Sequence, residues 1–295
     1  MIRYILIKLE SSISRTIVIA LADIFFFISW RALRLLPGGP RCPVCGALLA
    51  TVYRPVLSRL LAAQWNLNNE WANYLNRREG EICISCGGSI RARQMARTIA
   101  FWINKNCQIN SINTHKTGLM SLPLKNIKIA EINSCGAVHK LISKLSNLYY
   151  SEYNPSDPGI RHENLLSLSY SSESFDIVLH SDTLEHVFDI DQALAEIWRI
   201  LKPGGASIFS IPIVRDGRPS IARVSLQNGE LLHCKLPSYH GGSYQTTREY
   251  LVCYEFGEDF IPRLKNHGFH VTLIECEGNP MAVTFIAEKP GLQSL

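Results

Sequence analysis

The sequence predicts an α/β protein: a mostly parallel, doubly wound sheet with an antiparallel C-terminal hairpin, preceded by a small zinc-ribbon-like module and a hydrophobic helix. Short apolar segments alternate with amphipathic helical segments from residue 127 onward, which is typical of parallel strands joined by crossover helices. Two Cys-x-x-Cys pairs stand before that alternation, and a long apolar segment stands before them. A chain of 295 residues, 46% of them apolar, can form one large domain or two smaller ones.

The expected organisation has three parts, and the last carries an insertion at 214–257. These parts are a hydrophobic helix at 1–36, a four-cysteine zinc module with a helical insertion at 37–106, and the α/β domain at 107–295. The apolar run at 16–30 is shorter than the roughly 20 residues of a membrane-spanning helix, and it contains Asp23. Packing on the rest of the protein and contact with a membrane surface are both open for this helix.

Charge and cysteine usage limit the partners. Between Arg41 and Lys105 the sequence has nine Lys and Arg against three Asp and Glu, whereas between Lys128 and Ile213 it has six against eleven. A basic first third suits nucleic acid, anionic lipid or an acidic substrate, and solubility alone explains it equally well. Nine cysteines are an odd number, and five have no motif spacing. A reducing, cytoplasmic compartment is therefore expected rather than a disulfide framework.

The two cysteine pairs predict a structural metal site. Cys42-Pro-Val-Cys45-Gly and Cys83-Ile-Ser-Cys86-Gly each let two thiolates turn toward one ion, and the glycine permits the tight turn that follows. Four soft ligands close a tetrahedron and leave no open position, so we expect Zn²⁺ in a structural role, with iron as the alternative. In the spacer, Trp65, Leu67, Trp71 and Tyr74 recur near helical period and predict an inserted helix packed on the cysteine pairs.

The strands of the α/β domain are predicted from apolar runs. They are expected at residues 127–132, 148–153, 175–180, 206–213, 270–276 and 282–288, with Gly278-Asn-Pro joining the last two as a hairpin. A helical stripe from Ala193 to Leu201 should begin near Asp189 or Asp191 and end at Gly204-Gly205.

In order along the chain, EINSCGAVH (131–139), SEY (151–153), ENLLSLSYSSESFDIV (163–178), SDTLEHV (181–187) and IWRILKPGG (197–205) resemble class I S-adenosylmethionine-dependent methyltransferases. The resemblance covers residues 127–289 and is most specific at 168–212. It implies a seven-stranded Rossmann-like sheet that binds S-adenosylmethionine. This sequence departs from the family's Gly-x-Gly loop, because the two glycine positions hold Asn133 and Cys135. Asn tolerates a left-handed backbone, and Gly136 is one residue away.

The predicted cofactor residues follow from that resemblance and from the position of such sites at the carboxyl ends of parallel strands. Glu131 should order the first loop and meet the cofactor's ammonium, and Glu152 should accept two ribose hydroxyls. Asn164 should accept the adenine amine through its carbonyl oxygen, with Leu165 on the purine face. The full predicted set is Glu131, Asn133, Ser134, Gly136, Glu152, Asn164, Leu165 and Ser181.

The catalytic candidates are His240, Tyr239 and Asp182. The segment 214–257 is predicted to close over the cofactor as a lid, where His240 would act as a base, because histidine titrates near neutral pH. A solvent-facing His240 is the alternative. Asp182 follows a strand, so substrate chemistry and helix capping are both open.

The expected activity is methyl transfer to a small-molecule or glycan acceptor, at a hydroxyl. RNA methylation through the basic zinc module is less favoured, because no dense Lys/Arg stripe appears. A non-catalytic scaffold is the third possibility, favoured by Asn133 and Cys135 and opposed by Glu152.

Overall fold

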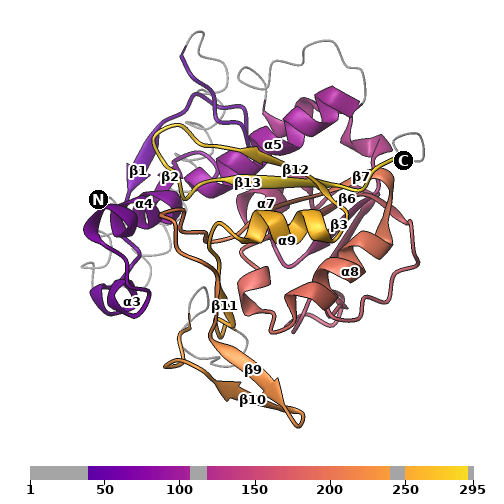
Figure 1. The fold of residues 1–295 in the computed structure, drawn as a ribbon. Helices are drawn as coiled ribbons and strands as arrows, with labels where there is room; N and C mark the ends of the chain where they lie inside the picture. Colours follow the sequence, from indigo (N-terminus) through magenta and orange to yellow (C-terminus); the bar gives the residue numbers. More distant parts are fainter. Residues whose placement is uncertain (1–38, 107–117, 240–249, 292–295) are drawn as a thin grey trace, which may run out of the picture.

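The computed structural model of the chain describes residues 39–106, 118–239 and 250–291 (Figure 1). In these residues a seven-stranded sheet has the strand order β12-β13-β7-β6-β3-β4-β5. Its parallel strands are β7 (Leu201–Ser210), β6 (Phe175–Ser181), β3 (Ile129–Ile132), β4 (Leu148–Glu152) and β5 (Arg161–His162). β13 (Thr284–Glu288) joins β7 antiparallel, and β12 (His270–Ile274) joins β13. The predicted mostly parallel sheet with its antiparallel C-terminal hairpin is confirmed.

Alternation along the strands divides the core between the two faces of the sheet. Successive side chains of a strand point to opposite faces, so Ile177 and Leu179 enter one apolar cluster and Val178 enters the other. The first face is covered by α5 (Ile90–Asn106) and α7 (Ala137–Ile142). The second is covered by α8 (Ile190–Ile200) and α9 (Phe260–Asn266).

The chain before β3 shares this core. The short strands β1 (Thr51–Tyr53) and β2 (Glu81–Cys83) pair antiparallel, and helices α3 (Arg59–Gln64) and α4 (Asn69–Gly80) lie between them. After the second cysteine pair, α5 crosses the sheet and contacts β13 and β7 (Figure 1). Two 3-10 turns, η1 (Leu119–Ser121) and η2 (Leu124–Asn126), then lead into β3. One apolar cluster therefore runs from the cysteine pairs to the sheet, and a domain boundary at residue 107 stays a prediction.

Two expectations about local packing are wrong. The aromatic spacer does not pack on the cysteine pairs: Trp71 and Leu75 form a separate cluster with Met281, joined by the partly buried Trp65 and Leu67 among others. The apolar stripe of α4 points toward the loop between β12 and β13, because the cysteine pairs are already covered by α5 and by the start of α7.

The second wrong expectation is the predicted end of helix α8 at Gly204-Gly205. Helix α8 does start at its predicted cap, since the Asp189 side chain accepts a hydrogen bond from the Gln192 backbone N–H at 3.0 Å. It ends at Ile200, however, and Leu201 already begins β7. Gly204-Gly205 lies inside β7, beside a register irregularity opposite Phe175–Ile177. A Cβ on Gly205 would meet three backbone oxygens at 3.0–3.1 Å. Glycine is therefore needed here, because the backbone lies close to its neighbours.

The segment between β7 and α9 has its own small strands. β8 (Ile221–Ala222) pairs with β11 (Tyr254–Glu255), while β9 (Val224–Gln227) and β10 (Glu230–His233) form a hairpin that projects away from the sheet (Figure 1). The predicted helix at 1–36 lies outside the described residues. Within residues 39–106, 118–239 and 250–291, no helix is long and apolar enough to cross a membrane.

Candidate active site and cysteine cluster

A cavity of about 860 Å³ lies at the carboxyl ends of β3, β4 and β6. Parallel strands of an open sheet place ligand sites at this edge. Of the predicted site residues, the lining includes Asn133, Ser134, Glu152, Asn164, Leu165, Ser181 and Asp182. Glu131, Gly136 and Tyr239 are not part of the lining, and His240 lies outside the described residues. The strands therefore bring together residues that are far apart in sequence.

The loop after β3 is held by Glu131. Its side chain is fully buried, accepting the Cys135 backbone N–H at 2.8 Å and lying 2.6 Å from His139 Nδ1. The hydrogen bond that His139 makes to the Glu131 carboxylate raises the pKa of His139. Asn133 has φ +58° and Gly136 has φ +61°, so both adopt the left-handed backbone. Glu131 thus orders the loop from beneath, while the space beside Gly136 is open.

Glu152 ends β4 at the cavity, where the Tyr150 hydroxyl donates a hydrogen bond to it. The Asn164 side-chain carbonyl accepts the Leu166 backbone N–H at 3.0 Å, which holds the loop in a turn. Leu165 is 4% exposed and belongs to the core, with one edge on the cavity.

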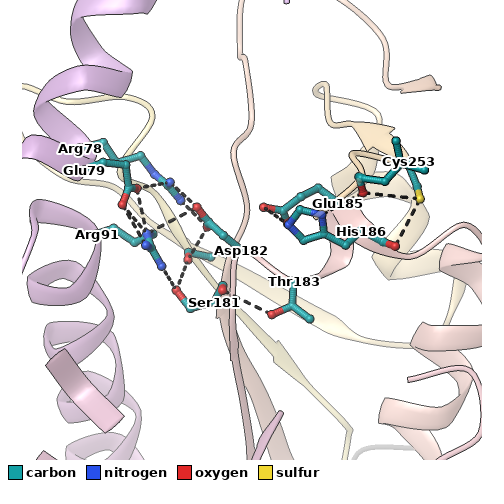
Figure 2. A network of polar contacts seen from close by, with 11 residues as sticks. Arg78, Glu79, Arg91, Ser181, Asp182, Thr183, Glu185, His186 and Cys253 are labelled. Carbon is teal, nitrogen blue, oxygen red and sulfur yellow. Dashed lines mark hydrogen bonds and ion pairs between the residues drawn. The ribbon is translucent and has the colours of Figure 1, made fainter. Parts of the chain in front are cut away.

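A buried charge cluster lies at the end of β6 and was missed from the sequence (Figure 2). Arg78 from α4 donates to both Asp182 carboxylate oxygens, each at 2.6 Å. Arg91 from α5 pairs with Glu79 at 2.8 Å and lies 3.5 Å from Asp182. It also donates to the Ser181 hydroxyl. The sequence signal was Arg78 on the apolar stripe of α4, three residues after Leu75 and seven after Trp71.

The charges in this cluster hold each other ionised. Burial favours the neutral acid at Asp182, but Arg78 and Arg91 outweigh it and keep the pKa of Asp182 well below its usual range. Burial opposes the charged forms of both arginines, and Asp182 and Glu79 more than compensate, so the pKa of each is raised. Asp182 is therefore a poor proton acceptor, and its contacts fix α4 and α5 to the cavity wall.

His186, from the 3-10 turn η3 (Leu184–His186), lines the other side of the cavity (Figure 2). Its Nδ1 lies 2.9 Å from the Leu251 carbonyl oxygen, which fixes the proton on Nδ1 and leaves Nε2 as the basic nitrogen. Burial lowers the pKa of His186, so the ring is neutral near pH 7. In the neighbouring Glu185, burial raises the pKa well above its usual range.

The four predicted metal ligands converge. The sulfur atoms of Cys42, Cys45, Cys83 and Cys86 all lie within 4.8 Å of one another. The Cys42 and Cys86 sulfurs are 3.8 Å apart, and about 3.8 Å is the edge of a tetrahedron with metal–sulfur bonds of about 2.3 Å. Both pairs make the same turn, since the Gly46 and Gly87 amides each donate to the first cysteine's carbonyl at 2.8 Å. All the described cysteines are free of disulfides.

The predicted lid contacts both the cavity and the helical insertion. Leu231, Tyr250, Leu251 and Cys253 line the cavity. On its other side Arg218 donates to the Trp65 carbonyl at 3.3 Å, and Trp65 Nε1 donates to the Ser238 hydroxyl at 3.0 Å. Tyr239 is 44% exposed. The described part of 214–257 therefore joins the insertion to the sheet edge as well as bordering the cavity.

Parts of the chain are similar to known methyltransferases. Residues 117–209 match the family model described as a methyltransferase domain. A probable S-adenosylmethionine-dependent methyltransferase of Mycolicibacterium smegmatis is 40% identical over 53 residues, 18% of this chain and 21% of that protein. The demethylmenaquinone methyltransferase of Lactobacillus johnsonii is 32% identical over 95 residues, 30% of this chain and 39% of the relative.

Among solved structures, a protein of Listeria monocytogenes described as a putative S-adenosylmethionine-dependent methyltransferase aligns with a TM-score of 0.36 and 18% identity. That alignment covers 57% of this chain and 92% of the Listeria protein. The chain spans about a fifth and two fifths of the lengths of the two curated relatives that it matches.

Proposed function

We propose that the chain transfers a methyl group from S-adenosylmethionine to a hydroxyl of a small-molecule or glycan acceptor. The observation that carries the proposal is the cavity at the carboxyl edge of the methyltransferase sheet, which Asn133, Ser134 and Glu152 line together. When bound, S-adenosylmethionine supplies an electrophilic methyl group on a sulfonium. The remaining task of the protein is to align the acceptor and to accept its proton.

The residues present suit this cofactor. Glu152 offers carboxylate oxygens to two ribose hydroxyls, and Ser134 and Asn133 offer polar groups beside it. Gly136 lies outside the cavity lining, and its positive φ of +61° suits the turn between β3 and α7. Asn164 and Leu165 would border the adenine. Glu131 would hold the loop in place and not contact the cofactor itself, because both its carboxylate oxygens already have partners.

We assign the proton acceptor to His186, since its neutral ring lines the cavity and keeps Nε2 as the basic nitrogen, 3.9 Å from the Glu185 carboxyl. His240 and Tyr239 remain candidates for orienting the acceptor. RNA is disfavoured because the cavity arginines, Arg78 and Arg91, are already neutralised by Asp182 and Glu79 and have no charge left for phosphate.

We also propose one structural Zn²⁺ per chain, held by Cys42, Cys45, Cys83 and Cys86, with iron as the alternative. Four converging thiolates at tetrahedral spacing support it. Contact of residues 1–36 with a membrane surface and a cytoplasmic location stay predictions.

One experiment with three variants tests the activity. Charge-assisted hydrogen bonds contribute about 1.5–3 kcal/mol each, so Glu152→Ala should weaken S-adenosylmethionine binding tenfold or more in calorimetry. Glu258→Ala, an exposed acid away from the cavity, should bind like the parent. His186→Gln should keep cofactor affinity but lower the turnover of labelled S-adenosylmethionine by about 100-fold, the usual scale of general base catalysis. Parent-like cofactor affinity in Glu152→Ala would refute the ribose assignment.

A further inference from the structure

One wall of the cavity comes from the insertion between the two cysteine pairs. Val56, Leu57, Leu61 and Trp65 line the cavity from α3 and its flanks. Helix α3 buries none of its residues. Leu61 therefore presents apolar surface to the cavity, and apolar lining of this kind marks ligand sites. Leu57 and Trp65 line the cavity too, while they also pack against the Trp71 cluster.

The opposite wall is apolar too. Val187 and Phe188 follow η3, and Leu231 and Leu251 come from the segment after β7. Val56 and Leu231 line the cavity and are also 58% and 43% exposed, so apolar surface continues from the cavity to the outside of the molecule.

The charges of the cavity exclude an anionic acceptor. Its two cations, Arg78 and Arg91, are matched by Asp182 and Glu79. Glu152 and Glu163 add two further carboxylates, of which Glu163 pairs with Arg161 outside the lining, and the buried His186 ring is neutral. The summed charge of the lining therefore favours a cationic cofactor and leaves nothing to neutralise a phosphate or carboxylate on the acceptor.

We propose that the acceptor carries a neutral apolar chain or ring that lies against Leu57, Leu61 and Trp65, with its hydroxyl directed toward His186. The inference rests on the proposed function and adds the substrate class: a neutral, lipid-like hydroxyl compound. An acceptor chain that is too long for the cavity extends out of it between Val56 and Leu231. The specificity of the enzyme is thereby set by the insertion, which the cysteine cluster anchors at both ends.

Matched probes test this on the full chain by calorimetry, with and without saturating S-adenosylhomocysteine. The probes are n-octyl β-D-glucopyranoside below its micelle concentration, methyl β-D-glucopyranoside and n-octyl phosphate. The octyl glucoside should bind about 100-fold tighter than the methyl glucoside, a factor that burial of about three to four methylene groups accounts for. It should also bind at least tenfold tighter than octyl phosphate.

Neighbouring leucines of α3 give the control. Leu61→Asn should weaken octyl glucoside binding tenfold or more, whereas Leu60→Asn, at a side chain that is 71% exposed and outside the lining, should not. Leu61→Ala, with a smaller loss, serves if Leu61→Asn does not fold. Equal binding of the two glucosides, tighter octyl phosphate, or equal losses in both asparagine variants would overturn the inference. Failure of S-adenosylhomocysteine to bind, with octyl glucoside still bound through Leu61, would refute the methyltransferase activity and leave the apolar subsite standing.

Discussion

Arg77 and Arg78 are adjacent in α4 and have opposite environments. Arg78 is buried in a bidentate pair with Asp182, whereas the Arg77 side chain is 45% exposed and pairs with Glu81 one turn later. Removing one partner of a buried pair leaves an uncompensated charge and costs about 3–5 kcal/mol. Exposed pairs contribute less than about 1 kcal/mol.

Arg78→Ala should therefore lower the free energy of unfolding by about 3 kcal/mol or more, and Arg77→Ala by less than about 1 kcal/mol. Urea unfolding of both variants measures the difference. Replacing Asp182 by Asn in the Arg78→Ala background should recover part of the loss, because the stranded charge is removed. Similar losses from Arg77→Ala and Arg78→Ala would contradict the buried pair.

His180 makes stability depend on pH. It is fully buried in β6, stacked on Phe209 at 4.6 Å, with Nε2 3.3 Å from the Ser207 hydroxyl. Burial lowers the pKa of His180 to about 3, and in the unfolded chain it is about 6.5. Below pH 6.5 the unfolded state gains a proton that the folded state does not, so this contribution to stability is complete above pH 6.5 and is lost toward pH 3.

At pH 5 the loss from His180 should be about 2 kcal/mol relative to pH 7.5, since each pKa unit corresponds to about 1.4 kcal/mol. Urea unfolding of the parent and of His180→Leu at both pH values isolates the contribution of His180 to stability. The other titrating groups contribute equally in the two proteins. An identical pH dependence in the two proteins would show that His180 is not buried as a neutral ring.

At the scale of elements, periodicity carried the prediction of the sheet. The run Phe175–Ser181 is apolar because β6 is covered on both faces, so its strand was predicted to within one residue. The start of β7 was misplaced by five residues, because Lys202-Pro203-Gly204-Gly205 has the composition of a helix stop. A local pattern cannot reveal that a partner strand accepts those glycines.

The insertion shows the same limit. Its helical period was recognised, but not the surface against which Trp71 packs, because an apolar stripe does not identify its partner. Six of the eight predicted cofactor residues, all except Glu131 and Gly136, line one cavity, since parallel topology brings the strand ends together. The Arg78–Asp182 pair was not predicted, because it joins residues 104 positions apart on different elements.

At the scale of the molecule, the cysteine cluster and the seven-stranded sheet share one core. Cys42 and Cys83 belong to the same apolar cluster as Val138 of α7 and Ile177 of β6. A Cβ on Gly88 would lie 3.5 Å from the Cβ of Ala137, so the second cysteine pair packs directly on α7, the helix that follows the loop after β3. Metal binding and cofactor binding are therefore expected to be coupled.

Removal of the metal should destabilise the whole described fold and not a separate module. Elemental analysis should find one zinc or iron per chain in the parent and in Cys234→Ser, whose cysteine is exposed and outside the cluster, and none in Cys83→Ser. Structural metal binding is folding free energy, so the melting temperature of Cys83→Ser should fall by about 10 °C or more, at about 2–4 °C per kcal/mol in large domains. The unfolding should remain a single transition, and S-adenosylmethionine affinity should fall with it, because the loop at Asn133–Ala137 loses its support. Two separate transitions, or full cofactor affinity in metal-free protein, would mean that the cysteine cluster folds independently of the site it packs against.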